Sequence, residues 1–236
     1  MIKFDRWWFP DGELNLPDAM LKVGHFETDL EGEPRITYQY HKYDVCRKAL
    51  LPERRRVAID VGAHVGLWTY WMQRDFEQVF AFEPAANHRE CFHANVEAAP
   101  GYRDNVTLFP FALGDTHGWV SLVHRPTASG GSHIYVDGEA EASSPKSTVA
   151  MHRLDDYNIP VCDFLKIDIE GFELPMLQGA VDLLQRTKPL IILETIVDNA
   201  ARYGRDKFTA VNYLESLGAH IVVRMGHHDL IMDWTR

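Results

Sequence analysis

The chain has 236 residues, 46% of them hydrophobic and 25% charged, and its 24 Lys and Arg against 34 Asp and Glu give a formal charge of −10. The hydrophobic fraction is that of a globular protein and argues against a disordered chain or a coiled coil. No apolar run approaches the roughly 18 residues that a membrane span needs. The acidic balance excludes the simplest nucleic-acid binder, which coats phosphates with excess Lys and Arg. We therefore expect a globular protein with neither a nucleic-acid nor a membrane partner.

The three cysteines, Cys46, Cys91 and Cys162, are scattered and form no CxxC pair. They are expected to be buried small residues in a reducing compartment, without a disulfide framework or a zinc site. The first residues are too polar for a signal peptide, which needs an uninterrupted apolar core. These features predict a cytoplasmic protein.

The first half of the chain changes character near residue 57. Residues 1–35 are rich in aromatic residues, Pro and Gly and show no clean periodicity, and 44–51 are predicted to form a short helix that ends at Pro52. After that, short β-branched runs alternate with helical patterns. This part of the pattern predicts strands at 57–61, 79–82 and 106–109, a helix after Gly66 and a helix over 85–98.

The middle of the chain is the least regular part. Residues 119–123 alternate as an edge strand does, and 127–132 form a loop of small residues. Regularity then returns up to the C-terminus. This part predicts strands at 164–169 and 189–194, a helix with Leu177, Ala180, Val181 and Leu184 on its apolar face, a helix at 208–217, and short strands at 220–224 and 229–233.

Strands that alternate with helices predict a mostly parallel sheet with helices on both faces. The last two strands have no helix between them, so they are expected to form an antiparallel hairpin at the edge. No linker or internal repeat divides the chain. We therefore predict one doubly wound α/β domain over residues 53–236, preceded by an N-terminal extension over 1–52.

The ends of the predicted strands carry the candidate ligand-binding residues, because ligands of such sheets bind beyond the carboxyl ends of the strands. The first strand contains Asp60 and is followed by Gly62 and Gly66, which lack Cβ and allow a sharp turn close to a ligand. Asp60 is placed where it could meet an ammonium group. Glu83 ends the second strand, where a carboxylate can accept hydrogen bonds from both hydroxyls of a ribose.

A cofactor with an amino-acid head and a ribose fits these residues, and S-adenosyl-L-methionine has both. The spacing G-x-x-x-G differs from the G-x-G-x-x-G of dinucleotide binders, so a pyrophosphate is not specially indicated. Taken alone, the two glycines could also form a turn that only packs a strand tightly against a helix. Asp60 before them and Glu83 after them favour the cofactor.

Five segments in chain order carry a family resemblance: 59–66 (IDVGAHVG), 81–84 (AFEP), 112–114 (ALG), 153–157 (RLDDY) and 163–173 (DFLKIDIEGFE). Together they resemble the FkbM family of S-adenosylmethionine-dependent methyltransferases. The resemblance runs from about residue 55 to residue 195, more weakly to the C-terminus, and KIDIEGFE is its most specific part. His64 stands where the family usually has Asn, and its ring is a candidate donor to the cofactor carboxylate.

The resemblance implies a class I methyltransferase fold, a seven-stranded sheet whose last strand is antiparallel. It implies that Gly62, Ala63 and Gly66 wrap the methionine part of the cofactor, that Glu83 holds the ribose and that adenine lies near Ala112. Family members typically methylate hydroxyl groups of small molecules or sugars. The implied reaction is therefore O-methylation, with S-adenosylhomocysteine as the product.

Asp168 and Glu170 are the candidate catalytic residues. They alternate along one strand end, so both side chains can point to the same side, and Asp168 has the position nearest to the transferred methyl group in this fold. Asp168 could hold the methionine ammonium, orient the acceptor or accept its proton; its alternative role is to order a loop or cap a helix. For Glu170 the alternative is a charge favoured by a helix N-terminus.

Other groups are weighed against simpler roles. Asp168, Glu170 and Glu194 could offer oxygen ligands to a metal, but the chain has no HxxxH or HExxH spacing, and we predict no metal. His133, beside the small-residue loop, is a candidate base near neutral pH, although loop histidines are more often simply exposed. The N-terminal extension, with the aromatic run 7–9, is a candidate lid over the acceptor or packs onto the end of the sheet.

Two other functions share these features. An NAD(P)-dependent oxidoreductase has the same strand, glycine turn and ribose-binding acid, but its third glycine is missing here. A non-catalytic nucleoside-binding domain would bind the cofactor without turnover.

A nucleic-acid methyltransferase usually has Asn/Asp-Pro-Pro-Tyr or a Pro-Cys nucleophile, and residues 168–171 match neither. Acidic strand ends suit a cationic sulfonium and a neutral or weakly charged hydroxyl acceptor, whose identity the sequence leaves open together with the oligomeric state.

Overall fold

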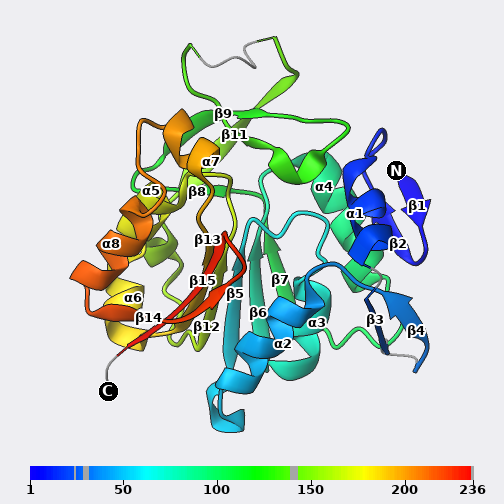
Figure 1. The fold of residues 1–236 in the computed structure, drawn as a ribbon, viewed down its shortest axis with the longest axis horizontal. Coiled ribbons are helices and arrows are strands. Elements are labelled where there is room, and N and C mark those ends of the chain that lie inside the picture. Colours follow the sequence, from blue (N-terminus) through cyan, green and yellow to red (C-terminus); the bar gives the residue numbers. More distant parts are fainter. Residues whose placement is uncertain (24, 29–31, 139–142, 235–236) are drawn as a thin grey trace.

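The computed structural model describes residues 1–23, 25–28, 32–138 and 143–234 (Figure 1). Its centre is a seven-stranded sheet with the order β14-β15-β13-β12-β5-β6-β7. All neighbours from β13 to β7 pair in parallel, and β15 pairs antiparallel with both β13 and β14. The predicted parallel sheet and C-terminal hairpin are confirmed. The strands are β5 (Val57–Val61), β6 (Gln78–Phe82), β7 (Val106–Phe109), β12 (Phe164–Ile167), β13 (Leu190–Glu194), β14 (Ala219–Met225) and β15 (Asp229–Trp234).

Helices cover both faces of this sheet (Figure 1). Successive residues of a buried strand point to opposite faces, and in β5 Ala58 belongs to one apolar cluster whereas Ile59 belongs to the other. The first cluster includes residues of α1 (Asn15–Val23), α2 (Tyr40–Ala49), α3 (Thr69–Asp75) and α4 (Ala86–Phe92), which a π-helical turn (His93–Glu97) continues. The second includes residues of α5 (Glu173–Gln178), α6 (Val181–Thr187) and α8 (Thr209–Ser216); α7 (Val197–Arg202) follows β13. No helix among the described residues is long and apolar enough to cross a membrane.

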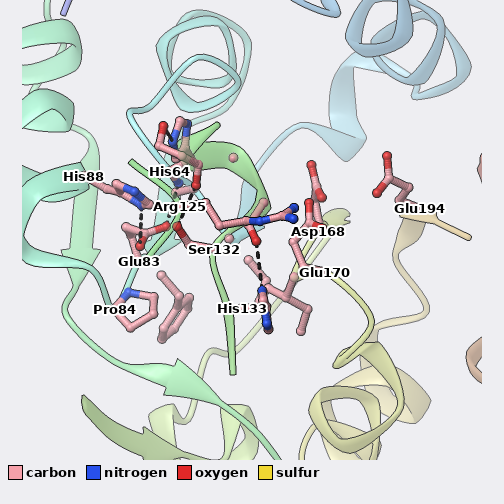
Figure 2. A pocket seen from close by; sticks show the side chains of 18 of the residues that line it. His64, Glu83, Pro84, His88, Arg125, Ser132, His133, Asp168, Glu170 and Glu194 are labelled. Atoms are coloured by element: carbon pink, nitrogen blue, oxygen red, sulfur yellow. Dashed lines mark hydrogen bonds and ion pairs between the residues drawn. The ribbon is translucent and has the colours of Figure 1, made fainter. Parts of the chain in front are cut away.

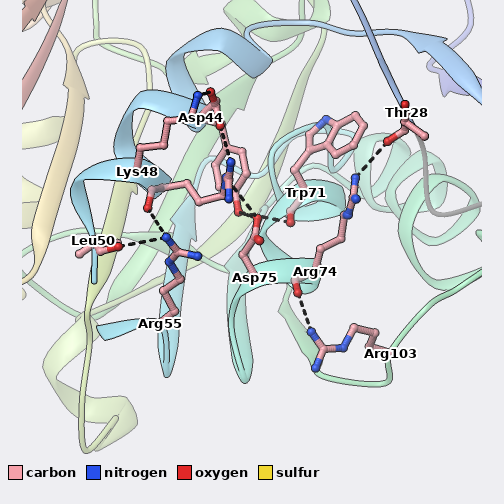
Figure 3. A network of polar contacts seen from close by, with 11 residues as sticks. Thr28, Asp44, Lys48, Leu50, Arg55, Trp71, Arg74, Asp75 and Arg103 are labelled. Atoms are coloured by element: carbon pink, nitrogen blue, oxygen red, sulfur yellow. Dashed lines mark hydrogen bonds and ion pairs between the residues drawn. The ribbon is translucent and has the colours of Figure 1, made fainter. Parts of the chain in front are cut away.

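The N-terminal extension is part of the packed core. It forms two hairpins, β1 (Ile2–Phe4) with β2 (Trp7–Phe9) and β3 (Phe26–Thr28) with β4 (Pro34–Ile36). Trp7 and Phe9 are fully buried in the same cluster as α3. Polar contacts also hold α2 in place (Figure 3). The Tyr43 hydroxyl donates to Asp75 of α3 at 2.6 Å, and Arg55, just before β5, donates to the carbonyl of Arg47 at 2.8 Å.

A second sheet of four strands lies beyond the central one, with the order β10-β9-β11-β8. Residues 119–123, predicted as an edge strand, form an inner strand of this sheet, so that prediction is wrong. The strand is exposed only at its start, where Trp119 is 75% exposed, whereas Leu122 and Val123 are buried. β10 pairs with Leu122 and Val123 alone, so the short partner strand left no signal in the pattern of residues 119–123. The strands are β8 (Ala112–Leu113), β9 (Gly118–Val123), β10 (His133–Ile134) and β11 (Lys146–His152).

The helix predicted from Leu177 to Leu184 is two helices, α5 and α6, with a break at Gly179. A Cβ at Gly179 would lie 1.9 Å from the carbonyl oxygen of Gly114, so the backbones approach too closely for any side chain. The Gly179 carbonyl also accepts a hydrogen bond from the backbone N–H of Asp155 at 3.0 Å, in the 3-10 turn Leu154–Tyr157. A contact between distant segments therefore breaks a pattern that is locally helical.

Candidate functional site

A cavity of about 420 Å³ lies at the carboxyl ends of the parallel strands. Its walls come from the ends of β5, β6, β12 and β13, from the segment 125–134 and from the N-terminal extension. Figure 2 shows Glu83 and His88 on one side of it and Asp168, Glu170 and Glu194 on the other. Of the predicted site residues, Gly62, Ala63, His64, Glu83, Ala112, Asp168 and Glu170 line the cavity, whereas Asp60 and Gly66 are not among its lining residues.

The two glycines of the first turn meet different demands. Gly62 has φ 76°, and a Cβ there would lie 1.9 Å from the carbonyl oxygen of Asp168. The turn thus packs directly against the backbone after β12 at the cavity wall, and only glycine fits at this position. Gly66 has φ 86°, and its Cβ would lie 2.5 Å from Cγ2 of Val96. Gly66 therefore allows close packing against the π-helical turn, which is the alternative that the spacing had left open.

Glu83 is a buried carboxylate with several hydrogen-bond partners. It accepts hydrogen bonds from the backbone N–H of His64 at 2.9 Å and of Ala85 at 2.8 Å, and Nδ1 of His88 lies 3.1 Å away. Burial would raise the pKa of Glu83, but His88 and the two backbone N–H groups outweigh it and lower the pKa. The ionised form is stabilised, as an acceptor of ribose hydroxyls requires.

The ring of His64 points toward the cavity-lining segment 125–134. Its φ is 52°, which is uncommon outside glycine. Nε2 of His64 and Oγ of Ser129 are 2.8 Å apart, and the ring meets that of His88 edge-on at 4.4 Å. Burial, then the nearby His88 and Lys166, hold the pKa of His64 well below its usual value. The imidazole is therefore neutral, and one of its two nitrogens is already engaged with Ser129.

Lys166 is a site residue that sequence reasoning missed. Its Nζ lies 3.1 Å from Oδ1 of Asp60 and 3.8 Å from Oδ2 of Asp168, and it donates to the carbonyl of Gly62 at 3.0 Å. Burial alone would lower the pKa of Lys166, but the two carboxylates outweigh it and raise the pKa. Asp60, which also accepts a hydrogen bond from Thr69 at 2.7 Å, thus has a cation inside the protein. A lysine inside a buried strand, two positions before Asp168, was the available signal.

Asp168, Glu170 and Glu194 form an acidic group at the other end of the cavity. Each offers one carboxylate oxygen, and these oxygens lie within 4.8 Å of one another, a spacing that could hold a cation or a shared proton. Asn199 donates to Glu170 at 2.8 Å. Burial and then the charge of Asp168 raise the pKa of Glu170 to about 8 and that of Glu194 to about 9. At neutral pH this acidic group therefore retains protons.

The N-terminal extension contributes Asn15, Leu16, Tyr38 and Gln39 to the cavity wall, whereas the aromatic run 7–9 lies outside it. Gln39 has φ 58°, and its side chain accepts a hydrogen bond from Trp68 at 3.1 Å. Burial, then the charges of Asp168 and Glu194, raise the pKa of Tyr38 to about 12. No motif marks these four residues, because only the fold brings them to the strand ends.

A family model described as Methyltransferase FkbM domain matches residues 60–221. Among curated proteins, Methyltransferase 1 of Beauveria bassiana is 25% identical over 187 residues, 70% of this chain and 72% of that protein. Hexuronic acid methyltransferase AglP of Haloferax volcanii is 29% identical over 143 residues, 59% of this chain and 56% of that protein.

Solved structures share the architecture. The Methyltransferase FkbM structure from Methylobacillus flagellatus superposes with a TM-score of 0.53 and 16% identity, over 77% of this chain and 44% of that chain. SMU.1697c from Streptococcus mutans, solved in complex with SAH, superposes with a TM-score of 0.51 and 9% identity, over 84% and 99%. At these identities the likeness concerns the fold, and it confirms the class I methyltransferase sheet.

Proposed function

Because the chain belongs to the FkbM methyltransferase family, we propose that it is an S-adenosyl-L-methionine-dependent O-methyltransferase acting on a hydroxyl group of a small molecule or sugar. One observation carries the proposal: a single cavity holds the ionised Glu83 at one end and the acidic group of Asp168, Glu170 and Glu194 at the other. A ligand with ribose hydroxyls and a positively charged sulfur is complementary to both ends.

The residues present fit this cofactor. The cavity volume of about 420 Å³ is in the usual range for a small-molecule site. A carboxylate has about four acceptor positions, so two backbone N–H groups and His88 leave Glu83 with one for the ribose. Gly62 and Ala63 line the wall where the methionine part would lie, and adenine would lie beside Ala112, which also lines the cavity. Asp60 does not line the cavity but forms an ion pair with Lys166, and Lys166 donates a hydrogen bond to the carbonyl of Gly62 in the cavity wall.

When bound, S-adenosyl-L-methionine supplies a methyl group that the positive sulfur makes electrophilic. An aliphatic hydroxyl is a weak nucleophile, so the chain must align it and take its proton. We assign the alignment to Asp168, which Lys166 holds from 3.8 Å. Glu170 in its ionised form, whose fraction grows as pH rises toward 8, takes the proton. A base works best when its pKa is near the working pH, and raised carboxyl pKa values meet that condition.

The acceptor class has support from the comparisons and from the cavity. AglP is named for its action on a hexuronic acid, which is a sugar. A wall of carboxylate oxygens together with the Asn199 amide can form several hydrogen bonds with the hydroxyls of such a ring. A hydroxyl-rich acceptor therefore fits this end of the cavity better than an apolar one.

Incubation with isotope-labelled S-adenosyl-L-methionine and a panel of sugars and hydroxylated small molecules tests the proposal. We expect labelled methyl ethers, detected by mass spectrometry, and no label with Asp168→Ala. Asp182→Ala removes an exposed carboxylate on α6 and is expected to transfer methyl groups as the unmodified protein does. Transfer to amines alone would overturn O-methylation.

The two alternatives predict other outcomes. If the protein is an NAD(P)-dependent oxidoreductase, NADH and not S-adenosylhomocysteine will raise its melting temperature. If it is a non-catalytic nucleoside-binding domain, S-adenosyl-L-methionine will bind without turnover over the whole panel.

A further inference from the structure

Glu13 is a buried carboxylate that lies far from the cavity in sequence but next to it in space. Its side chain is 0% exposed. One oxygen accepts a hydrogen bond from the backbone N–H of Leu16 at 2.9 Å, and the other accepts one from the backbone N–H of Ser129. Burying a carboxylate is costly unless hydrogen bonds compensate it. The buried Glu13 carboxylate therefore stabilises the conformation in which the N–H groups of Leu16 and Ser129 point at it.

The same two segments are also joined by their backbones. The carbonyl oxygen of Thr127 accepts hydrogen bonds from the N–H groups of Leu14 at 3.1 Å and Asn15 at 3.2 Å. The 3-10 turn Ser129–Gly131 follows directly and lines the cavity. The N-terminal extension thus holds the cavity-lining segment 125–134 at two adjacent points, which we call the clamp, and Glu13 is the side chain in it.

From this clamp, hydrogen bonds lead to the ribose end of the cavity. Oγ of Ser129 lies 2.8 Å from Nε2 of His64, and the backbone N–H of His64 donates to Glu83 at 2.9 Å. Ser129 therefore donates to Glu13 with its backbone N–H and contacts His64, in the glycine turn, with its side chain. His64 takes a left-handed conformation there, so its position depends on such contacts.

We propose that Glu13 is a positioning residue for the cofactor: it fixes Ser129, and through Ser129 and His64 it keeps Glu83 and the glycine turn in the form that binds S-adenosyl-L-methionine. The proposal rests on the proposed function. Glu13 lies outside residues 60–221, the region that the family model matches. The N-terminal extension thus completes a cofactor site whose other residues lie within the family region.

Calorimetric titration with S-adenosylhomocysteine tests this without any acceptor. Glu13→Gln keeps the shape but replaces one accepting oxygen by a donor, and Ser129→Ala removes only the contact with His64. We expect each variant to bind S-adenosylhomocysteine about three- to tenfold more weakly, the effect of losing one hydrogen bond. Glu13 and Ser129 act through one chain of contacts. The double variant should therefore bind S-adenosylhomocysteine only slightly more weakly than the single variant with the lower affinity.

Two controls match these changes outside the cavity. Asp11→Asn removes an exposed charge from the same segment, where Asp11 lies 2.7 Å from the N-terminal amine. Ser147→Ala removes a contact of the same length, 2.8 Å, between Ser147 and His124. Both are expected to leave the dissociation constant unchanged.

Melting temperatures without ligand separate positioning from a purely structural role. If Glu13→Gln and Ser129→Ala melt earlier but bind S-adenosylhomocysteine as the unmodified protein does, the inference is overturned. If the unmodified protein does not bind S-adenosylhomocysteine, the proposed function itself fails. Weaker binding confined to the two clamp variants supports the inference.

Discussion

The cavity holds two glutamates at strand ends that behave in opposite ways. Glu83, after β6, has two backbone donors and His88 beside it, and its pKa is lowered. The side chain of Glu194, at the end of β13, accepts no hydrogen bond from the described residues, and burial, then the nearby Asp168 and Glu170, raise its pKa to about 9. Glu83 is thus held as an anion, whereas Glu194 retains its proton, although both are glutamates at the same edge of the sheet. Burial acts on both in the same direction, so their hydrogen-bond and charged partners decide which of them is ionised.

Lys166 contacts Asp60, Asp168 and the carbonyl of Gly62, and its removal should have the largest effect. Lys166→Met leaves Asp60, which is fully buried, without its cation. Breaking a buried pair from one side typically costs about 3–5 kcal/mol of unfolding free energy, and urea denaturation measures it. Lys48→Met breaks an exposed ion pair with Asp44 on α2 and should cost less than about 1 kcal/mol. Similar losses for the two variants would contradict the assigned role of Lys166.

Glu83→Gln tests the fixed anion. A hydrogen bond to a charged group contributes about 1.5–3 kcal/mol, so we expect S-adenosylhomocysteine to bind roughly 10- to 100-fold more weakly in calorimetric titration. Glu90→Gln makes the same charge change at an exposed position of α4 and should bind normally. If both variants bind normally, Glu83 does not hold the ribose.

The proton-carrying end should appear in the pH dependence of stability. The carboxyl pKa values of Glu170 and Glu194 rise from 4.5 when unfolded to about 8 and about 9 in the folded protein. The folded state then binds more protons, so the stability that they contribute is complete below pH 4.5 and falls as pH rises toward 9.

Glu194→Gln removes one of these groups and also removes a like charge from Glu170, whose pKa should fall. We therefore expect the variant to lose less stability than the unmodified protein between pH 6 and pH 9 in urea denaturation. Glu215→Gln, an exposed change on α8, should keep the original slope. Parallel curves for all three proteins would contradict raised pKa values at this end.

Chelation is expected to have the smallest effect. The acidic group could accept a divalent cation by its spacing, but the Lys166 ammonium near Asp168 and the retained protons already reduce its negative charge. We predict that EDTA leaves methyl transfer unchanged and that Mg²⁺ or Mn²⁺ does not raise the melting temperature. A loss of transfer with EDTA that Mg²⁺ restores would instead identify this end as a metal site.

Much of the framework could be predicted because its signals are local. Residues 57–61 form a strand by composition alone, and Gly62 and Glu83 were placed at the cavity because parallel strands end at one edge. The break at Gly179 escaped prediction, since its cause is the backbone of Gly114 in another part of the chain. Lys166 escaped too, since its two partners are recognised only once β5 and β12 are paired.

The sequence by itself determined the sheet, its winding and the carboxylates at its edge, because hydrophobic periodicity and strand-end position are properties of neighbouring residues. Only the tertiary structure decided which carboxylate is ionised and which retains a proton. It also decided that Glu13 and Ser129 meet beside the cavity. The physical reason is that charge state and hydrogen bonding depend on burial and on partners that folding brings together from distant segments.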